Sequence, residues 1–187
     1  MIRLERVGIR GTPISLHWSV LAVCAVLGFA GSREPFALAC GIASYFGMML
    51  VHEAGHVLMA RRFGYRAVAV ELYPIHGITR LPHIAEPFAR AMIAWGGVLA
   101  QLVVAAPLVA WLAVFGYTHY GPVNAILGVL GAVSVAIACL NLLPFRPLDG
   151  AVAWTVVPIL FRALRARPES DRRDRPRRHE KPLRRIH

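Results

Sequence analysis

Residues 52–56, with the sequence His-Glu-Ala-Gly-His, combine two side chains that can hold a metal ion with one that can activate water. On a helix, positions four residues apart lie on one face, so the imidazoles of His52 and His56 can reach the same cation, with Glu53 on the same turn. This is the His-Glu-x-x-His spacing of zinc hydrolases. The alternative is that both histidines are only packed and hydrogen-bonded against neighbouring helices.

The position of this stretch in the chain favours the metal. It lies near the end of an apolar run that begins at Pro35. An ionisable side chain inside a membrane-spanning helix costs several kcal/mol unless it is paired. A divalent cation would bind both imidazoles while Glu53 holds its water.

A catalytic zinc site takes three protein ligands and keeps one position for water. Outside the basic C-terminal segment, the other acidic residues and histidines are Glu5, Glu34, Glu71, Glu86, Asp149, His17, His76, His83 and His119. Asp149 follows an apolar run in LNLLPFRPLDGAVAW, where two prolines interrupt the helix. At membrane depth a broken helix is tolerated where it lines a protein cavity. Asp149 is therefore a candidate third ligand, and a plain N-cap for the helix after it is equally compatible with the local sequence. We interpret His76 and His83 as interfacial histidines rather than ligands.

The elements that would position these residues are long apolar segments. Hydrophobic residues make up 57% of the chain, and a helix needs about 20 mostly apolar residues to cross a bilayer. The segments 15–31, 36–60, 90–116 and 122–143 meet or nearly meet this length. The run 150–161 is too short to cross and predicts a non-spanning helix. The sequence thus predicts an all-α polytopic membrane protein with about four transmembrane helices.

Lysine and arginine are concentrated in the N-terminal arm, in the connection 61–90 and in the C-terminal segment. By the positive-inside rule, both termini and this connection lie in the cytoplasm of a multi-pass protein of the cell membrane. We expect 164–187 to be a disordered cytoplasmic tail that meets anionic lipid headgroups. Residues 165–187 contain no aromatic side chain that could stack on bases, so we expect no nucleic acid as a partner.

Two motifs together carry a family resemblance. His52-Glu53-x-x-His56 in one span, and Asn141-x-x-Pro144-x-x-x-Leu148-Asp149-Gly150 at the end of another, resemble the site-2 protease family of intramembrane zinc metalloproteases. The compact type without a PDZ or CBS module fits this length, with a protease domain over 1–163. GTPISLHWSV near the N-terminus and ELYPIHGITRL after the metal-binding helix are similar to that type as well. The third span differs, because Gln101 stands where the family commonly has an asparagine.

The resemblance implies a role for each residue. His52, His56 and Asp149 would bind one zinc ion per chain. Glu53 would be the general base and then the proton donor, which agrees with the chemistry, because zinc lowers the pKa of its water. Asn141 would orient the substrate or stabilise the oxyanion, and the alternative is that it only bonds another helix.

Residues 66–81 predict a small membrane-associated β-hairpin. Arg66–Tyr73 is rich in valine, Pro74–Gly77 suits a turn, and Ile78–Leu81 can return as the second strand. Its edge could pair with an unwound substrate close to the metal. The alternative is a plain amphipathic connector.

The sequence as a whole predicts a zinc endopeptidase that cuts another membrane protein in or near a transmembrane segment. The alternative function is a metal or proton transporter with a midmembrane His/Glu site. Transporters of that kind usually contain paired repeats, and this sequence shows none.

Overall fold

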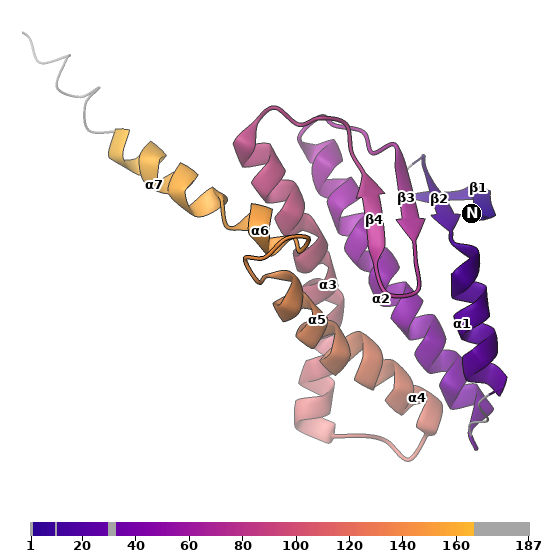
Figure 1. The fold of residues 1–187 in the computed structure, drawn as a ribbon. Helices are drawn as coiled ribbons and strands as arrows, with labels where there is room; N and C mark the ends of the chain where they lie inside the picture. Colours follow the sequence, from indigo (N-terminus) through magenta and orange to yellow (C-terminus); the bar gives the residue numbers. More distant parts are fainter. Residues whose placement is uncertain (1, 10, 30–32, 167–187) are drawn as a thin grey trace, which may run out of the picture. The chain divides into compact units, whose positions relative to one another are not determined.

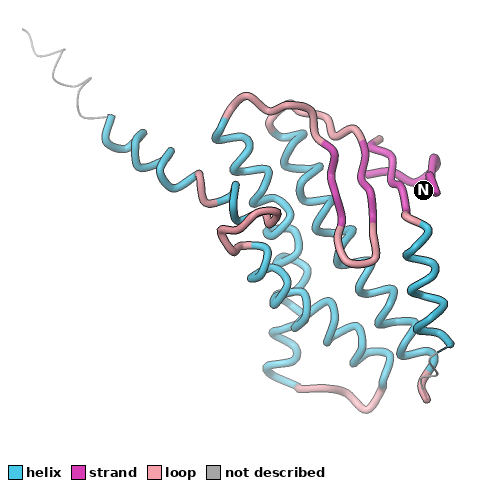
Figure 2. Tube along the Cα trace, viewed as in Figure 1, coloured by secondary structure: helices cyan, strands magenta, loops and turns pink. Residues whose placement is uncertain are grey.

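The computed structural model describes residues 2–9, 11–29 and 33–166. Helices dominate this part of the chain, and four short strands form one sheet (Figures 1 and 2). The predicted basic tail lies outside the described residues from position 167 onward.

Three helical segments are long and apolar enough to cross a membrane. They are α2 (Pro35–Arg62), α3 (Pro87–Phe115), and the succession of α4 (Gly121–Ile126), the π-helix η1 (Leu127–Val133) and α5 (Ser134–Asn141). Many of their large apolar side chains face outward, as side chains in contact with lipid do; Val103 is 75% exposed and Val114 is 72% exposed. These segments match the predicted spans 36–60, 90–116 and 122–143 and indicate a membrane protein.

The predicted span 15–31 is different in the structure. Residues Thr12–Leu16 form strand β2, and the helix that follows, α1 (Trp18–Phe29), has 12 residues. At 1.5 Å per residue this helix reaches about 18 Å, which is shorter than a crossing requires. A fourth crossing is therefore not found within the described ranges, and the count of four spans stays a prediction.

The sheet is larger than the single predicted hairpin. Its order is β1-β2-β3-β4, with β1 (Ile2–Ile9), β3 (Ala69–Leu72) and β4 (Gly77–Arg80). Strands β2 and β3 run parallel, and the other two pairs are antiparallel. The sequence analysis predicted a single hairpin in an all-α membrane protein, and the two N-terminal strands that complete this sheet were not predicted. β3 is an inner strand and β4 is an edge strand.

One face of the sheet packs on α2. Ile14 of β2, Val70 of β3 and Val57 of α2 belong to one buried apolar cluster, and Val57 and Val70 are fully buried. β4 lies in front of α2 in Figure 1. This packing places the edge strand next to the part of α2 that carries the histidines.

Glycines allow α2 and α3 to approach each other closely. A Cβ atom added to Gly96 on α3 would lie 2.6 Å from the carbonyl oxygen of Gly55 and 2.8 Å from Cβ of Met59, both on α2. No real side chain fits at such distances, so the glycines set the spacing of the two helices.

The predicted non-spanning helix 150–161 is divided in the structure. It consists of α6 (Gly150–Ala153) and α7 (Val156–Ala166), separated at Trp154 and Thr155. Residues 157–166 of α7 belong to a unit separate from the rest of the described chain. Within that unit α7 exposes the apolar side chains of Val157, Leu160, Phe161 and Leu164. This pattern is typical of a helix that lies in a membrane interface.

Candidate functional site

Two histidines of α2 and an aspartate that follows α5 meet at one point. The Nε2 atoms of His52 and His56 are 3.1 Å apart. Oδ2 of Asp149 lies 2.9 Å from Nε2 of His52 and 3.3 Å from Nε2 of His56. The three candidate ligand atoms all lie within 4.8 Å of one another. The structure thus brings together the three residues that the sequence suggested as metal ligands.

Asp149 stands in the N-cap position of α6 without acting as a cap. Its side chain makes no capping hydrogen bond and instead faces the two histidines. The purely local explanation of this residue is therefore not supported.

Two tryptophans hold the segment that carries Asp149. Nε1 of Trp95, on α3, donates to the carbonyl oxygen of Ala153 at 3.1 Å, and Nε1 of Trp154 donates to that of Leu142 at 2.6 Å. The two indole rings meet edge to face, with centroids 5.3 Å apart. The first bond attaches the C-terminal end of the segment that carries Asp149 to α3, and the second ties that end to the start of the segment.

The protonation of the imidazoles can be deduced from their other nitrogens. Nδ1 of His56 lies 2.8 Å from the carbonyl oxygen of Ile93, which can only accept, so Nδ1 carries the proton. Nδ1 of His52 lies 3.0 Å from Oε1 of Gln101. Both rings then direct a lone pair on Nε2 toward the same point, and such lone pairs repel unless a proton or a metal cation lies between them. Two imidazole nitrogens and one carboxylate oxygen form a ligand set that suits zinc and leaves a position for water.

Space at this point depends on a glycine of α3. A Cβ atom added to Gly97 would lie 2.5 Å from Nε2 of His56 and 2.8 Å from Nε2 of His52. A larger residue would press on both nitrogens, so Gly97 keeps open the place where the ligand atoms converge. The sequence analysis did not identify this role.

Glu53 follows His52 on α2, and the edge strand β4 holds its side chain. It is 4% exposed, and Oγ1 of Thr79 on β4 donates to Oε2 of Glu53 at 2.5 Å. Gly77 leaves room for this side chain, because a Cβ atom there would lie 2.6 Å from Cγ of Glu53. The carboxylate is thus buried, ordered and hydrogen-bonded beside the histidines.

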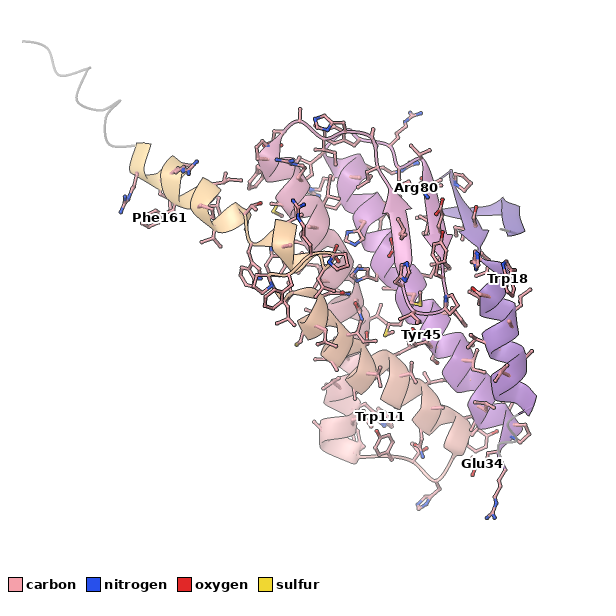
Figure 3. All side chains as sticks on the ribbon, viewed as in Figure 1. Trp18, Glu34, Tyr45, Arg80, Trp111 and Phe161 are labelled. Carbon is pink, nitrogen blue, oxygen red and sulfur yellow. The ribbon has the colours of Figure 1, made fainter. Side chains whose placement is uncertain are left out.

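An ion pair stiffens the hairpin that carries Thr79. The guanidinium of Arg80, labelled in Figure 3, donates from Nη2 to Oε2 of Glu71 at 2.9 Å and from Nε to Oε1 at 2.5 Å. These hydrogen bonds, together with the positive charge of Arg80, lower the pKa of the Glu71 carboxyl. Glu71 therefore remains ionised at neutral pH and links β3 to β4.

A cavity of about 740 Å³ opens onto these residues. The five predicted site residues, His52, Glu53, His56, Asn141 and Asp149, all line it. Asn141 is the last residue of α5, and among the described residues its side chain has no hydrogen-bond partner. His76 lines the cavity outside the ligand cluster, stacked on Tyr73 with ring centroids 5.0 Å apart. His83 is exposed.

No family model matches this chain. It is 29% identical over 157 residues to "Putative zinc metalloprotease Rip3" of Mycobacterium tuberculosis, an alignment that covers 76% of this chain and 40% of that protein. It is 24% identical over 143 residues to "Zinc metalloprotease MJ0392" of Methanocaldococcus jannaschii, which covers 76% of this chain and 41% of the relative. The chain thus spans less than half the length of these relatives.

The fold is similar to that of a solved structure, "Site-2 Protease from Methanocaldococcus jannaschii". The TM-score is 0.62 at 24% sequence identity, over 83% of this chain and 70% of the other. At this level of identity the likeness concerns the fold.

Proposed function

We propose that this chain, which is related in sequence to zinc metalloproteases and shares the fold of a site-2 protease, is an intramembrane zinc endopeptidase. The observation that carries the proposal is the meeting of two imidazole nitrogens and a carboxylate oxygen beside a buried glutamate. They line one cavity among helices apolar enough to cross a membrane. The substrate is another membrane protein, cut in or near a transmembrane helix.

Each residue of the site has a chemical task in this proposal. When bound by His52, His56 and Asp149, zinc would act as a Lewis acid that polarises the substrate carbonyl and lowers the pKa of water. Glu53 takes the proton of the attacking water and passes it to the leaving amine. Asn141 donates its amide N–H to the substrate oxygen on which negative charge develops.

We propose that the substrate backbone binds along the free edge of β4. The N–H of Tyr73 donates to the carbonyl of His76 at 2.9 Å, so these two residues form a hydrogen-bonded pair of the antiparallel ladder. Hydrogen-bonded and non-hydrogen-bonded pairs alternate along such a ladder, which makes the pairs of Gly77 and Thr79 with β3 non-hydrogen-bonded. The backbone groups of Gly77 and Thr79 therefore point away from β3, on the edge that lines the cavity. An unwound substrate segment can pair with them by strand addition.

Two substitutions of Thr79 test this pairing. Thr79→Val removes the hydrogen bond to Glu53 and should lower kcat about tenfold. Thr79→Pro removes the same hydroxyl and also the backbone N–H on the free edge. An edge strand tolerates proline at a position whose N–H does not bond to the neighbouring strand. Cleavage of a membrane substrate should therefore fall further, by about another fivefold to tenfold. Equal rates for the two variants, at equal thermal stability in detergent, would contradict strand addition at β4.

We further propose that both termini and the connection between α2 and α3 are cytoplasmic. The positive-inside rule supports this, because α2 ends in Arg61 and Arg62, whereas the connection between α3 and α4 contains no lysine or arginine. Reporter fusions after Arg62 and Arg173 should be active as cytoplasmic markers, and a fusion at Tyr120 as an external one. With the Arg62 reporter cytoplasmic, an external reporter at Arg173 would show an odd number of crossings after α2 and would contradict this topology.

Purified full-length protein in lipid nanodiscs tests the function itself. It should contain about one zinc ion per chain, as one set of three ligands requires, and cut a reporter that contains a transmembrane helix. Removing the metal with a chelator should stop cleavage, and added zinc should restore it. Zinc or proton flux into proteoliposomes without any cleavage would instead establish the transporter.

A further inference from the structure

A buried glutamine links one candidate metal ligand to another helix. Gln101 on α3 is 1% exposed and is the largest fully buried side chain among the described residues. Its Oε1 lies 3.0 Å from Nδ1 of His52 on α2, and its Nε2 donates to the carbonyl oxygen of Ser134 at 2.9 Å. Ser134, the first residue of α5, is likewise 1% exposed. The amide thus joins three helices at a buried point beside the cavity.

The chemistry of these partners fixes the direction of each hydrogen bond. The carbonyl of Ser134 can only accept, so the amide nitrogen of Gln101 must face it and the amide oxygen must face His52. Because that oxygen can only accept, the proton of His52 has to be on Nδ1. A backbone carbonyl of α5 therefore determines, through Gln101, that Nε2 of His52 is free to bind a cation.

The two histidines differ in how they are held. Nδ1 of His56 donates to the backbone carbonyl of Ile93, a partner that no substitution removes. Nδ1 of His52 depends on a side chain, and an unpaired amide buried in an apolar helix would itself cost free energy. The placement of Gln101 in such a helix is explained if its bond to His52 serves the site.

We propose that Gln101 is a positioning residue that sets the tautomer and the ring orientation of His52 for metal binding. The proposal rests on the metal site of the proposed function and assigns Gln101 no contact with substrate. It acts on the metal through His52 alone.

Two substitutions separate this role from a merely structural bridge. Gln101→Leu has a similar volume, leaves both partners unpaired, and should weaken zinc binding about 10-fold to 100-fold. Gln101→Glu keeps an oxygen that accepts from Nδ1 of His52 but loses the donor to Ser134. It should retain zinc affinity within about threefold, since a carboxylate serves equally well behind a metal-binding histidine. A structural bridge predicts the opposite order, because Gln101→Glu places a carboxylate against the Ser134 carbonyl.

The measurement is zinc affinity, by competition with a chromogenic chelator, on full-length protein in micelles. Val98→Ala is the matched control, because Val98 is fully buried one turn away on α3 and has no group that could accept from His52. It should lower thermal stability and leave zinc affinity unchanged. Wild-type affinity in Gln101→Leu, or equal losses in Gln101→Leu and Gln101→Glu, would overturn the role of Gln101 alone. A wild-type protein that binds no zinc would overturn the proposed function and this inference together.

Discussion

Glu53→Gln should keep zinc at the wild-type level and lower the cleavage rate about 10²-fold to 10⁴-fold, the usual contribution of a general base. Glutamine has the same shape and can still accept the hydrogen bond from Thr79 through its amide oxygen, so the packing beside β4 should persist. The amide cannot take a proton from water. Cleavage of a transmembrane reporter and zinc content should be measured on the same purified sample.

Glu71→Gln is the control for this experiment. Glu71 is also a buried glutamate of the sheet region, but it pairs with Arg80 and does not line the cavity. Its substitution should lower thermal stability and should reduce kcat far less than Glu53→Gln does. If Glu53→Gln remained fully active, the role of Glu53 as base would have to be abandoned.

Asp149→Asn should lower zinc affinity more than 100-fold, because it removes a charged ligand atom. Substituting a residue that only hydrogen-bonds to a ligand typically lowers metal affinity by roughly 10-fold to 100-fold. This substitution separates the two explanations of Asp149 clearly. Asparagine is as good an N-cap as aspartate, so a capping role predicts no effect. Zinc affinity and thermal stability in the zinc-free state should be measured together, and the second should change little.

Glu86→Gln controls for the loss of a negative charge. The carboxylate of Glu86 caps α3, accepting from the backbone N–H groups of Phe88 and Ala89. Its substitution should reduce stability and spare zinc affinity. Normal zinc binding by Asp149→Asn would move the third-ligand role to another residue.

The sequence predicted the parts of the site that depend on local spacing. His52 and His56 share a face because they are four residues apart on one helix. Three of the membrane spans could be predicted from the length of their apolar segments alone. Asp149 could be proposed because two prolines mark the broken helix before it, although its distance from the histidines needed the structure.

What the sequence did not predict depends on contacts between distant segments. Residues 15 and 16 adjoin an apolar helix and were assigned to the span 15–31, yet together with residues 12–14 they form a strand that pairs with β3, more than fifty positions away. Gly97 and Gln101 acquire their roles only when α3 lies against α2. The one available signal was composition, since a Gly-Gly pair and a glutamine are unusual within an apolar helix.

The three candidate ligands rest on two different kinds of support. His52 and His56 belong to a helix packed tightly on α3 at Gly55 and Gly96, whereas Asp149 is carried by a short segment held by two indole hydrogen bonds. The helix pair can keep His52 and His56 in place while Asp149 moves away from them with its segment. The lifetime of the bound ion should then be governed by undocking of that segment, so weakening either indole bond should speed zinc release without accelerating unfolding. Such a protein can fold in the membrane first and bind its metal ion afterwards.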